Sequence, residues 1–378
     1  MAGIYVHIPF CKSRCIYCDF FSTTSLTERD RYVAAIKKEL ELRINYLPSN
    51  TEIETIYFGG GTPSMLSASQ LCDILKHIKH IYQVSNDAEI TAEGNPDDLN
   101  EDFLRSIREG GFNRLSMGIQ TFNDSRLKFL CRRHTAEIAK KSIENARKVG
   151  FNNISIDLMY GFPNESLEDW NSDIDQALLL APEHISAYSL MYEEGTQLYK
   201  MLESGRIEEI DEDISVEMYN LLIERLQSSG YEHYEISNWG KPSMHSRHNS
   251  SYWEGIPYLG VGAGAHSFDG ISRQWNPNSL EEYLEGITSH NPIIEKEVLT
   301  PNQRFNEMVM TGLRTAKGID LKRLETLFGK HRLEYCIKNA RPHIEAGRLE
   351  LCDNTNSMRL TRNGLFVSDD IMSDLMML

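Results

Sequence analysis

The chain lacks the features that would mark it for a membrane or for export. No apolar run approaches the ~20 residues of a membrane-spanning helix. The N-terminus has neither the basic segment nor the apolar segment that signal peptides contain. The seven cysteines are an odd number in a chain without an export signal, which argues against a disulfide framework. Together these absences predict a cytoplasmic protein.

Basic charge is also scarce. The net charge of −16 is unfavourable for wrapping nucleic acid, because nucleic-acid binding needs clustered Lys and Arg. Basic residues do gather at 132–134, where an anion site and a solvated helix start are equally compatible with them. No internal repeat or low-complexity segment occurs. The length of 378 residues allows one large domain of about 250 residues and a smaller one.

What the sequence does contain, close to its start, is a loop with three closely spaced cysteines. Cys11, Cys15 and Cys18 follow a short β-branched run. Three thiolates at this spacing can bind three irons of a cubane iron–sulfur cluster and leave the fourth iron open to a ligand. The spacing resembles the signature of the radical S-adenosylmethionine (SAM) superfamily.

A zinc site is the alternative for this loop, with the three thiolates and His7 as ligands. Structural cysteines without a metal fit less well, because the loop is polar and Pro9 precedes it. The remaining cysteines have no such spacing, and we expect them to be buried small hydrophobic residues: Cys72, Cys131, Cys336 and Cys352.

Short strand-like runs alternate with amphipathic stretches along the first 230 residues. The predicted strands span residues 4–8, 54–58, 88–93, 114–119, 153–158 and 184–190. The predicted helices span residues 28–46, 68–82, 101–109, 135–149, 167–180 and 213–228. This alternation is typical of βαβ units and a parallel sheet. Six units are too few for a closed eight-stranded barrel, so we predict an α/β fold, a (β/α)6 partial TIM barrel with a lateral opening.

Polar residues stand at the carboxyl ends of the predicted strands. They are the cysteine loop, the Gly-Gly-Gly-Thr-Pro loop at 59–63, Glu93, Gln120 and Asp157. Because parallel barrels build their active sites at those ends, we expect these residues to converge at one mouth. The glycines at 59–61 would let the backbone approach a ligand closely, although a tight βα turn explains them equally well.

Taken singly, Glu93, Gln120, Arg132 and Asp157 are also compatible with ordinary strand-end or cap positions. Together they supply what SAM requires. Asp157 can accept hydrogen bonds from ribose hydroxyls, Arg132 can pair with the methionine carboxylate, and Gln120 can bond nearby.

The second half of the chain changes character. Residues 231–269 are rich in Trp, Tyr, His, Asn and Gly, a composition that predicts irregular segments and short strands closing the open side of the barrel. Helices are predicted again at 300–315, 321–328 and 333–345, followed by a strand and turn at 359–367. This pattern indicates a small winged-helix-like cap. The predicted domains are therefore 1–230 for the partial barrel, 231–295 for the closing extension and 296–378 for the C-terminal cap.

Four motifs together resemble one branch of the radical SAM superfamily. They are Tyr-Val-His-Ile-Pro-Phe-Cys at 5–11, Gly-Gly-Gly-Thr-Pro at 59–63, Ser-Met-Gly-Ile-Gln at 116–120 and Asp-Leu-Met-Tyr-Gly at 157–161. The branch contains oxygen-independent coproporphyrinogen III oxidase (HemN) and its relatives, the heme chaperones called HemW. The resemblance covers nearly the whole chain, including the C-terminal cap.

Three features distinguish the two members of this branch, and all three favour the HemW pattern. The oxidase has a further cysteine two residues after the third, where this chain has Phe20. The oxidase also begins with an additional substrate-contacting segment, whereas Tyr5 is almost at the start here. The HemW pattern His-Asn-x-x-Tyr-Trp occurs as His248-Asn249-Ser-Ser-Tyr252-Trp253.

The resemblance implies roles for individual residues. Cys11, Cys15 and Cys18 would ligate a [4Fe-4S] cluster. The residues that would line the SAM pocket are Tyr5, Tyr17, Gly60, Gly61, Thr62, Glu93, Gln120, Arg132 and Asp157. His248 would contact heme, with Tyr252 and Trp253 as apolar walls and Arg247 as a cation for the propionates; a structural histidine is the alternative. His245 and His266 are other candidate ligands in the same segment.

The function implied by the resemblance is that of a heme-binding chaperone. It would carry a [4Fe-4S] cluster and SAM, and deliver heme to hemoproteins, including membrane-bound ones. The resemblance leaves open whether the protein is an enzyme, and we expect no coproporphyrinogen III dehydrogenase activity. The alternatives are an oxygen-independent coproporphyrinogen III oxidase of porphyrin biosynthesis, which would decarboxylate two propionates, and radical chemistry on another substrate.

Overall fold

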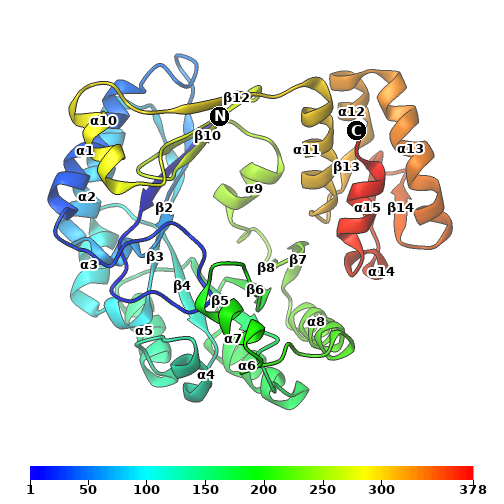
Figure 1. The fold of residues 1–378 in the computed structure, drawn as a ribbon, viewed down its shortest axis with the longest axis horizontal. Helices are drawn as coiled ribbons and strands as arrows, with labels where there is room; N and C mark the ends of the chain where they lie inside the picture. The colour runs from blue at the N-terminus through cyan, green and yellow to red at the C-terminus, as the bar shows by residue number, and fades with distance from the viewer. Residues whose placement is uncertain (378) are drawn as a thin grey trace.

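A computed structural model describes residues 1–377 and contains a twelve-stranded sheet with helices on its outer face (Figure 1). Its centre consists of six parallel strands in chain order. These are β1 (Ala2–Ile8), β2 (Ile53–Gly60), β3 (Val84–Gly94), β4 (Arg114–Gln120), β5 (Ile154–Tyr160) and β6 (His184–Ser189). All six predicted strands are present, and the predicted α/β partial barrel is confirmed.

Helices follow each of the six strands, and most of them cover the outer face of the sheet. They are α1 (Arg29–Leu42), α2 (Ala68–Ile81), α3 (Glu101–Glu109), α4 (Asp124–Phe129), α5 (Ala136–Lys148), α6 (Leu167–Leu180), α7 (Gln197–Glu203) and α8 (Glu212–Ser228). Leu198 of α7 packs instead against Ile16 of the cysteine loop. Two 3-10 turns, η1 (Pro63–Met65) and η2 (Pro96–Asp98), lie after β2 and β3. Ser67 and Ser166 begin α2 and α6 with capping boxes, which satisfy backbone N–H groups that a helix start leaves free.

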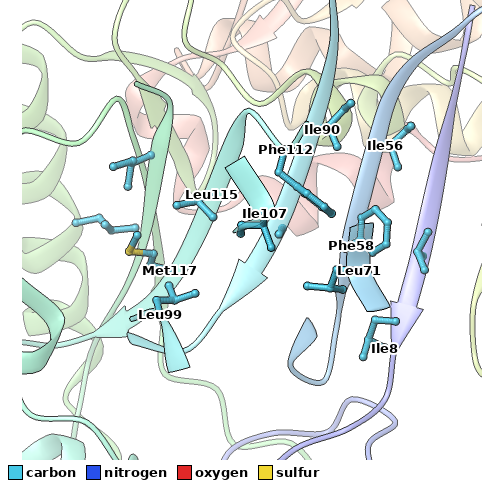
Figure 2. Packing of buried hydrophobic residues seen from close by; sticks show 14 of the residues in the cluster. Ile8, Ile56, Phe58, Leu71, Ile90, Leu99, Ile107, Phe112, Leu115 and Met117 are labelled. Carbon is cyan, nitrogen blue, oxygen red and sulfur yellow. The ribbon is translucent and has the colours of Figure 1, made fainter. Parts of the chain in front are cut away.

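Side chains alternate along these strands, and the apolar set points outward to the helices. Figure 2 shows this layer, in which Ile56, Phe58 and Leu115 lie between the sheet and residues such as Leu71 and Ile107 of the helices. Full burial of each such side chain contributes about 1.5–3 kcal/mol. The helix-covered layer is therefore the hydrophobic core, and the inner face of the sheet is left to other residues.

The segment after α8 extends the sheet at both edges. β7 (Glu232–Glu235) and β8 (Asn238–Gly240) add antiparallel strands beside β6, and β9 (Tyr258–Val261) pairs in parallel with β1. Beyond β9 lie β10 (His266–Phe268), β11 (Ser272–Trp275) and β12 (Glu295–Val298), with α10 (Leu280–Thr288) between the last two. The predicted short strands exist, but they flank the barrel on two sides rather than closing one.

One part of this segment is a helix, contrary to the sequence-based prediction of irregular structure. α9 (Arg247–Trp253) stands opposite the inner face of the sheet (Figure 1). The Ser246 side chain caps it, and the buried Glu89 carboxylate of β3 accepts the backbone N–H groups of Arg247 and His248 at 3.1 and 3.0 Å. A partner about 158 residues away along the chain stabilises the helix start, so local composition could not reveal it.

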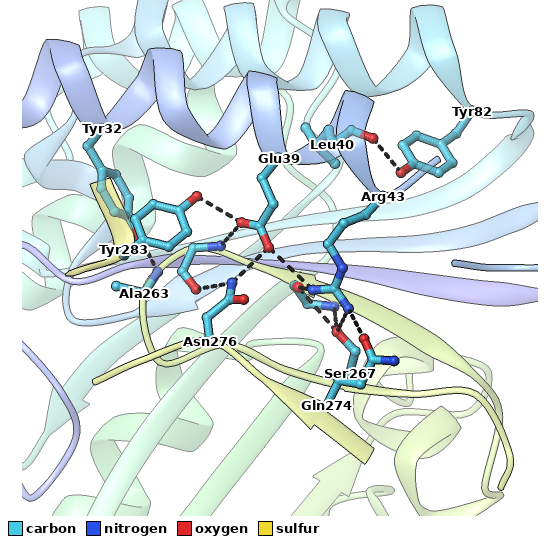
Figure 3. Close-up of polar contacts among 12 residues, drawn as sticks. Tyr32, Glu39, Leu40, Arg43, Tyr82, Ala263, Ser267, Gln274, Asn276 and Tyr283 are labelled. Carbon is cyan, nitrogen blue, oxygen red and sulfur yellow. Dashed lines mark hydrogen bonds and ion pairs between the residues drawn. The ribbon is translucent and has the colours of Figure 1, made fainter. Parts of the chain in front are cut away.

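A buried polar network fastens this extension to α1 (Figure 3). Glu39, which is fully buried, accepts hydrogen bonds from Asn276 at 2.7 Å, from Tyr283 at 2.8 Å and from the Gly262 backbone at 2.8 Å. Arg43 pairs with Glu39 at 3.3 Å and donates to the Gly260 carbonyl at 3.0 Å. Apart from the Arg43–Glu39 ion pair, each of these bonds joins residues more than 200 positions apart in the chain. The network therefore fixes the position of the extension relative to α1.

The C-terminal part has a hydrophobic core of its own. Its elements are α11 (Pro301–Leu313), β13 (Ile319–Asp320), α12 (Leu321–Phe328), α13 (Lys330–Glu345), β14 (Leu349–Cys352), β15 (Ser357–Leu360), α14 (Arg362–Leu365) and α15 (Ser368–Leu375). The helices and the β14–β15 hairpin agree with a winged-helix-like cap. Residues 362–365 form a helix capped by Thr361, not the predicted continuation of a strand and turn. We retain 1–230, 231–295 and 296–378 as proposed domain limits.

Two further sequence expectations can be compared with the structure. Cys336 is buried, but Cys131 is exposed at a backbone φ of +61°, and Cys72 and Cys352 are half-buried. The expectation that these four thiols are buried therefore holds only for Cys336. None of the helices within residues 1–377 combines the length and the apolar character needed to cross a membrane.

Candidate functional site

The inner face of the partial barrel is polar. From β1 to β6 it presents tyrosines, carboxylates, an arginine and serines, in alternation with the outward apolar residues. Between this face and α9 lies a cavity of about 320 Å³, which we call the lumen. The lumen is lined by Tyr5, Tyr57, Glu93, Arg114, Ser116, Ser155, Asp157, Ser186, Tyr188, His248, Asn249 and Tyr252. A barrel interior with this lining is suited to a polar ligand rather than to packing alone.

The cysteine loop lies at the mouth of the lumen, at the carboxyl end of β1. Cys11 Sγ lies 3.5 Å from the Thr62 hydroxyl, and Arg132 Nη1 lies 3.6 Å from Cys15 Sγ. Burial raises the pKa values of the Cys11 and Cys18 thiols, and the neighbouring Cys15 thiol raises both further. Three sulfurs that repel one another as thiolates need positive charge between them.

The donor set fits an iron–sulfur cluster better than the alternative zinc site. Zinc would need His7 as a fourth ligand, but both ring nitrogens of His7 are engaged. Nδ1 lies 3.1 Å from the Tyr5 hydroxyl, and Nε2 lies 3.2 Å from the Phe21 carbonyl oxygen. No group of three His, Cys, Asp or Glu side chains in residues 1–377 is arranged to hold a single metal ion.

The glycine loop after β2 is tied to a buried carboxylate of β3. Gly60 has a backbone φ of +110°, and a Cβ there would collide with the His7 ring, so only glycine fits. Its N–H donates to Glu93 Oε2 at 3.2 Å, and the Tyr57 hydroxyl donates to Glu93 Oε1 at 2.6 Å. Burial raises the pKa of Glu93 to about 7 despite these bonds. Gly61 is held by its N–H to the Ile8 carbonyl at 2.9 Å.

Arg132 connects the cysteine loop with β3 and β4. Its Nη2 donates to Asn95 Oδ1 at 2.7 Å and to the Gly118 carbonyl at 2.5 Å. A Cβ at Gly118 would lie 2.8 Å from the Gln120 amide and 3.0 Å from Arg132, so these two side chains flank the same backbone. Much of the guanidinium is thus engaged by the protein, which leaves less of it for the methionine carboxylate than the sequence suggested.

Asp157 and Tyr17 complete the mouth. The Ser116 hydroxyl donates to Asp157 Oδ1 at 3.4 Å, and burial raises the pKa of Asp157 to about 6. Burial also raises the pKa of Tyr17, whose hydroxyl is close enough to Arg132 and Cys15 for their charges to act on it. The residues predicted for the mouth are therefore brought together, as the positions of the strand ends indicated.

The His-Asn-x-x-Tyr-Trp segment forms α9, and only part of it faces the lumen. His248 is fully buried, with Nδ1 2.8 Å from the Thr55 hydroxyl and Nε2 2.8 Å from the Tyr252 hydroxyl. Its ring stacks on Tyr57 at a centroid separation of 5.0 Å. Trp253 turns away to the C-terminal part, where the Arg314 guanidinium lies 5.0 Å above its ring. The expectation that Trp253 forms a wall beside His248 is therefore wrong.

The expectation that Arg247 supplies the cation beside this motif is also not supported. Arg247 Nη1 donates to the Asp87 carbonyl at 2.8 Å and Nη2 to Glu54 Oε2 at 3.4 Å, on the outer rim. The other candidate histidines are engaged elsewhere. His245 pairs with Glu232 at 2.8 Å, and the exposed His266 stacks on Trp275.

Comparisons with known proteins agree with this architecture. The model of the radical SAM superfamily matches residues 5–177, and that of the HemN C-terminal domain matches residues 299–367. Heme chaperone HemW of Bacillus subtilis is 36% identical over 335 residues, covering 87% of this chain and 88% of that protein. HemW of Mycobacterium tuberculosis is 36% identical over 85% of this chain and 84% of its own length. The chain belongs to the HemW family.

A solved structure gives the same fold. Coproporphyrinogen III oxidase (HemN) from Escherichia coli superposes with a TM-score of 0.85 at 22% identity, over 99% of this chain and 89% of that one. At this identity the likeness speaks for the fold alone. In this HemW-family chain, Phe20, two positions after Cys18, has an exposed side chain.

Sequence reasoning missed several residues of this HemW-family site. Asn95 bonds both Arg132 and the Thr62 hydroxyl, and Asn249 of α9 faces the lumen. The most consequential is Arg114, which lines the lumen from the first position of β4. A signal was available, because Arg114, Ser116, Gly118 and Gln120 alternate with Leu115, Met117 and Ile119 in a predicted strand.

Proposed function

We propose that this HemW-family protein binds a [4Fe-4S] cluster through Cys11, Cys15 and Cys18. The observation that carries the proposal is the meeting of these three thiols with Thr62 and Arg132 at the mouth of a polar lumen. The Arg132 cation, 3.6 Å from Cys15 Sγ, would offset part of the negative charge that thiolate ligands bring to the cluster. His7, with both nitrogens engaged, would hold Tyr5 and the loop rather than a metal.

SAM is the second proposed ligand, and its pocket would lie between the cluster loop and the lumen. Its lining would consist of Tyr5, Tyr17, Gly60, Gly61, Thr62, Glu93, Gln120, Arg132 and Asp157. Ionised Glu93 would attract the positively charged ligand, and Asp157 would accept from ribose hydroxyls. When bound together, cluster and SAM supply one-electron chemistry; the chain's part is to hold both out of water.

Heme is the proposed cargo. The relatives are named heme chaperones, and we propose that this protein likewise binds heme near His248 and passes it to hemoproteins, including membrane-bound ones. To ligate iron through Nε2, His248 would have to release its hydrogen bond to Tyr252. All seven cysteines are free thiols among the described residues, which suits the reducing cytoplasm that we propose as the place of action.

The test separates the chaperone from the oxidase. Anaerobically reconstituted protein is given heme in one tube, and coproporphyrinogen III with SAM and a reductant in another. We expect a heme spectrum in the first tube and no decarboxylated porphyrin by chromatography in the second, because Phe20 stands where the oxidase has a cysteine. Product formation that depends on SAM and reductant would instead establish the oxidase.

A further inference from the structure

The floor of the lumen contains a buried cation, Arg114, that the protein pairs only weakly. Arg114 is 1% exposed, and within residues 1–377 its Nε and Nη1 have no hydrogen-bond partner. Glu89 Oε2 lies 4.0 Å from Nε, at the limit of an ion pair. The Glu89 oxygens already accept the N–H groups at the start of α9. A guanidinium has five N–H donors, and burying them unpaired is costly.

The groups around Arg114 suit an oxyanion. Ser116, Ser155, Ser186 and Asn249 also line the cavity. Two of these hydroxyls have partners in the protein, Ser116 on Asp157 and Ser155 on His184, so a ligand oxygen would compete with those contacts. The two carboxyl groups that line the lumen, Glu93 and Asp157, repel an anion less than two fully ionised carboxylates would. Burial raises the pKa of Glu93 to about 7 and that of Asp157 to about 6, so both bind protons near neutral pH more readily than exposed carboxyls do.

Arg114 also lies well below the mouth. It begins β4, whereas Gly118 and Gln120, beside Arg132, lie at its carboxyl end. Four residues of a strand separate Arg114 from Gly118 by about 13 Å. A carboxylate held at the cluster loop therefore cannot reach Arg114 at the same time. The floor is a second anion position, separate from the one proposed for the methionine carboxylate.

We propose that Arg114 binds a carboxylate of the porphyrin cargo, one propionate of heme, at the floor of the lumen. The inference rests on the proposed function and names the part of the cargo that enters the barrel. A cavity of about 320 Å³ is at the small end of ligand pockets and takes one arm of a large ligand. Tyr5, Tyr57 and Tyr252 would flank that arm with aromatic surface. This cation takes the role that sequence reasoning gave to Arg247.

The experiment compares heme with its dimethyl ester, in which both carboxylates are blocked. Binding of each to the full-length, anaerobically reconstituted protein is followed by absorbance. We expect the parent to prefer heme over the ester about tenfold to a hundredfold, as for a charged hydrogen bond. Arg114→Gln should reduce this preference to below about threefold by weakening heme binding alone. Arg114→Lys should keep part of it, and Arg247→Gln, on the outer rim, should keep it all.

Each other outcome overturns the inference in a recognisable way. A parent that binds heme and its ester equally well would refute the role of the carboxylate without any variant, and would leave heme binding itself intact. A parent that binds neither would refute the proposed function as well. SAM binding is measured in parallel by equilibrium dialysis, and Arg114→Gln should not change it. If the variant weakened SAM and not heme, the carboxylate at the floor would belong to SAM.

Discussion

Two buried arginines of this protein, each beside a buried glutamate, have opposite surroundings. Arg43, 6% exposed, donates to Glu39, to the Gly260 carbonyl at 3.0 Å and to Ser267 and Gln274 at 3.1 Å each (Figure 3). Arg114, 1% exposed, has no hydrogen-bond partner for Nε or Nη1 among residues 1–377, and its ion pair with Glu89 is 4.0 Å long. The first lies between the core and the sheet extension, the second in the lumen.

This difference in hydrogen bonding distinguishes an arginine that stabilises the fold from one that is available to bind a ligand. A charged network whose guanidinium makes four hydrogen bonds to the protein specifies one arrangement of the chain. Burying a charge without acceptors costs free energy, and a bound ligand of opposite charge can offset that cost. The inner and outer faces of the sheet differ in the same way, since the outer one is packed and the inner one is polar and hollow.

The largest expected effect is the loss of the cluster when one of its proposed cysteine ligands is replaced. Replacing Cys11, Cys15 or Cys18 with Ala should abolish binding of about four irons and four sulfides, because three thiolates are the smallest set that anchors the cube. Iron and sulfide analysis after anaerobic reconstitution measures this. Cys336→Ala, in the core of the C-terminal part, is the control and should keep the cluster while losing stability. Equal loss of the cluster in Cys131→Ala would contradict the three-ligand assignment.

The second prediction tests the two arginines directly. Arg43→Met should lower the free energy of unfolding by about 3–5 kcal/mol, because it leaves the Glu39 carboxylate buried without its cation. Arg114→Met should change it by less than about 1 kcal/mol, because its ion pair with Glu89 is long, at 4.0 Å, and the Glu89 carboxylate keeps two backbone N–H donors. Denaturant unfolding of the protein without ligands gives both values. A loss at Arg114 as large as at Arg43 would show that Arg114 serves the fold.

The third prediction uses the raised pKa of Glu93. With a pKa of about 7, about a tenth of Glu93 is ionised at pH 6 and about nine tenths at pH 8. If ionised Glu93 attracts the SAM cation, affinity should rise up to about tenfold over this interval. Titration of the amino group of SAM affects the parent and the Glu93→Gln variant equally, so the difference between their pH profiles reports the Glu93 carboxylate. The variant should bind more weakly and keep only the increase of about twofold that ionisation of Asp157, with a pKa of about 6, allows; an identical increase in both would exclude Glu93 as its source.

The smallest effect is expected at α9. Tyr252→Phe removes the hydroxyl that occupies His248 Nε2, so heme should bind a few-fold more tightly if that nitrogen ligates iron, since about 1 kcal/mol is released. His248→Ala should shift the Soret band and spare the cluster. His245→Ala and His266→Ala serve as parallel controls. A parental spectrum in His248→Ala, together with a changed one in either control, would make His248 structural.

The fold was predictable because its signals are local. Each of the six parallel strands contains a short, largely apolar run that alternates with an amphipathic stretch, and Ser67 and Ser166 mark two helix starts by capping boxes. The mouth was predictable for a second reason, since parallel strands bring their carboxyl ends to one edge. The cysteine loop, Gly60, Glu93 and Arg132 meet there, as expected from sequence order alone.

What could not be predicted depends on partners far along the chain. α9 begins on Glu89, which no composition of residues 247–253 reveals. Trp253 and Arg247 are adjacent to residues that face the lumen, yet helix geometry turns one to Arg314 and the other to Glu54. Arg114 could not be predicted from the rule that active-site residues lie at the carboxyl ends of parallel strands, because it is the first residue of β4.

The position of β1 affects how the protein is made. β1 precedes both of its neighbours in the chain, yet it lies between them, and its Gly3 pairs with Thr55 on one side and with Tyr258 on the other. Such distant pairing forms late, since chains fold in the order of synthesis and long loops close slowly. Until β9 arrives, β1 is an open edge strand with the cysteine loop at its end. A nascent chain can therefore enclose the loop on both sides only after most of it has been synthesised.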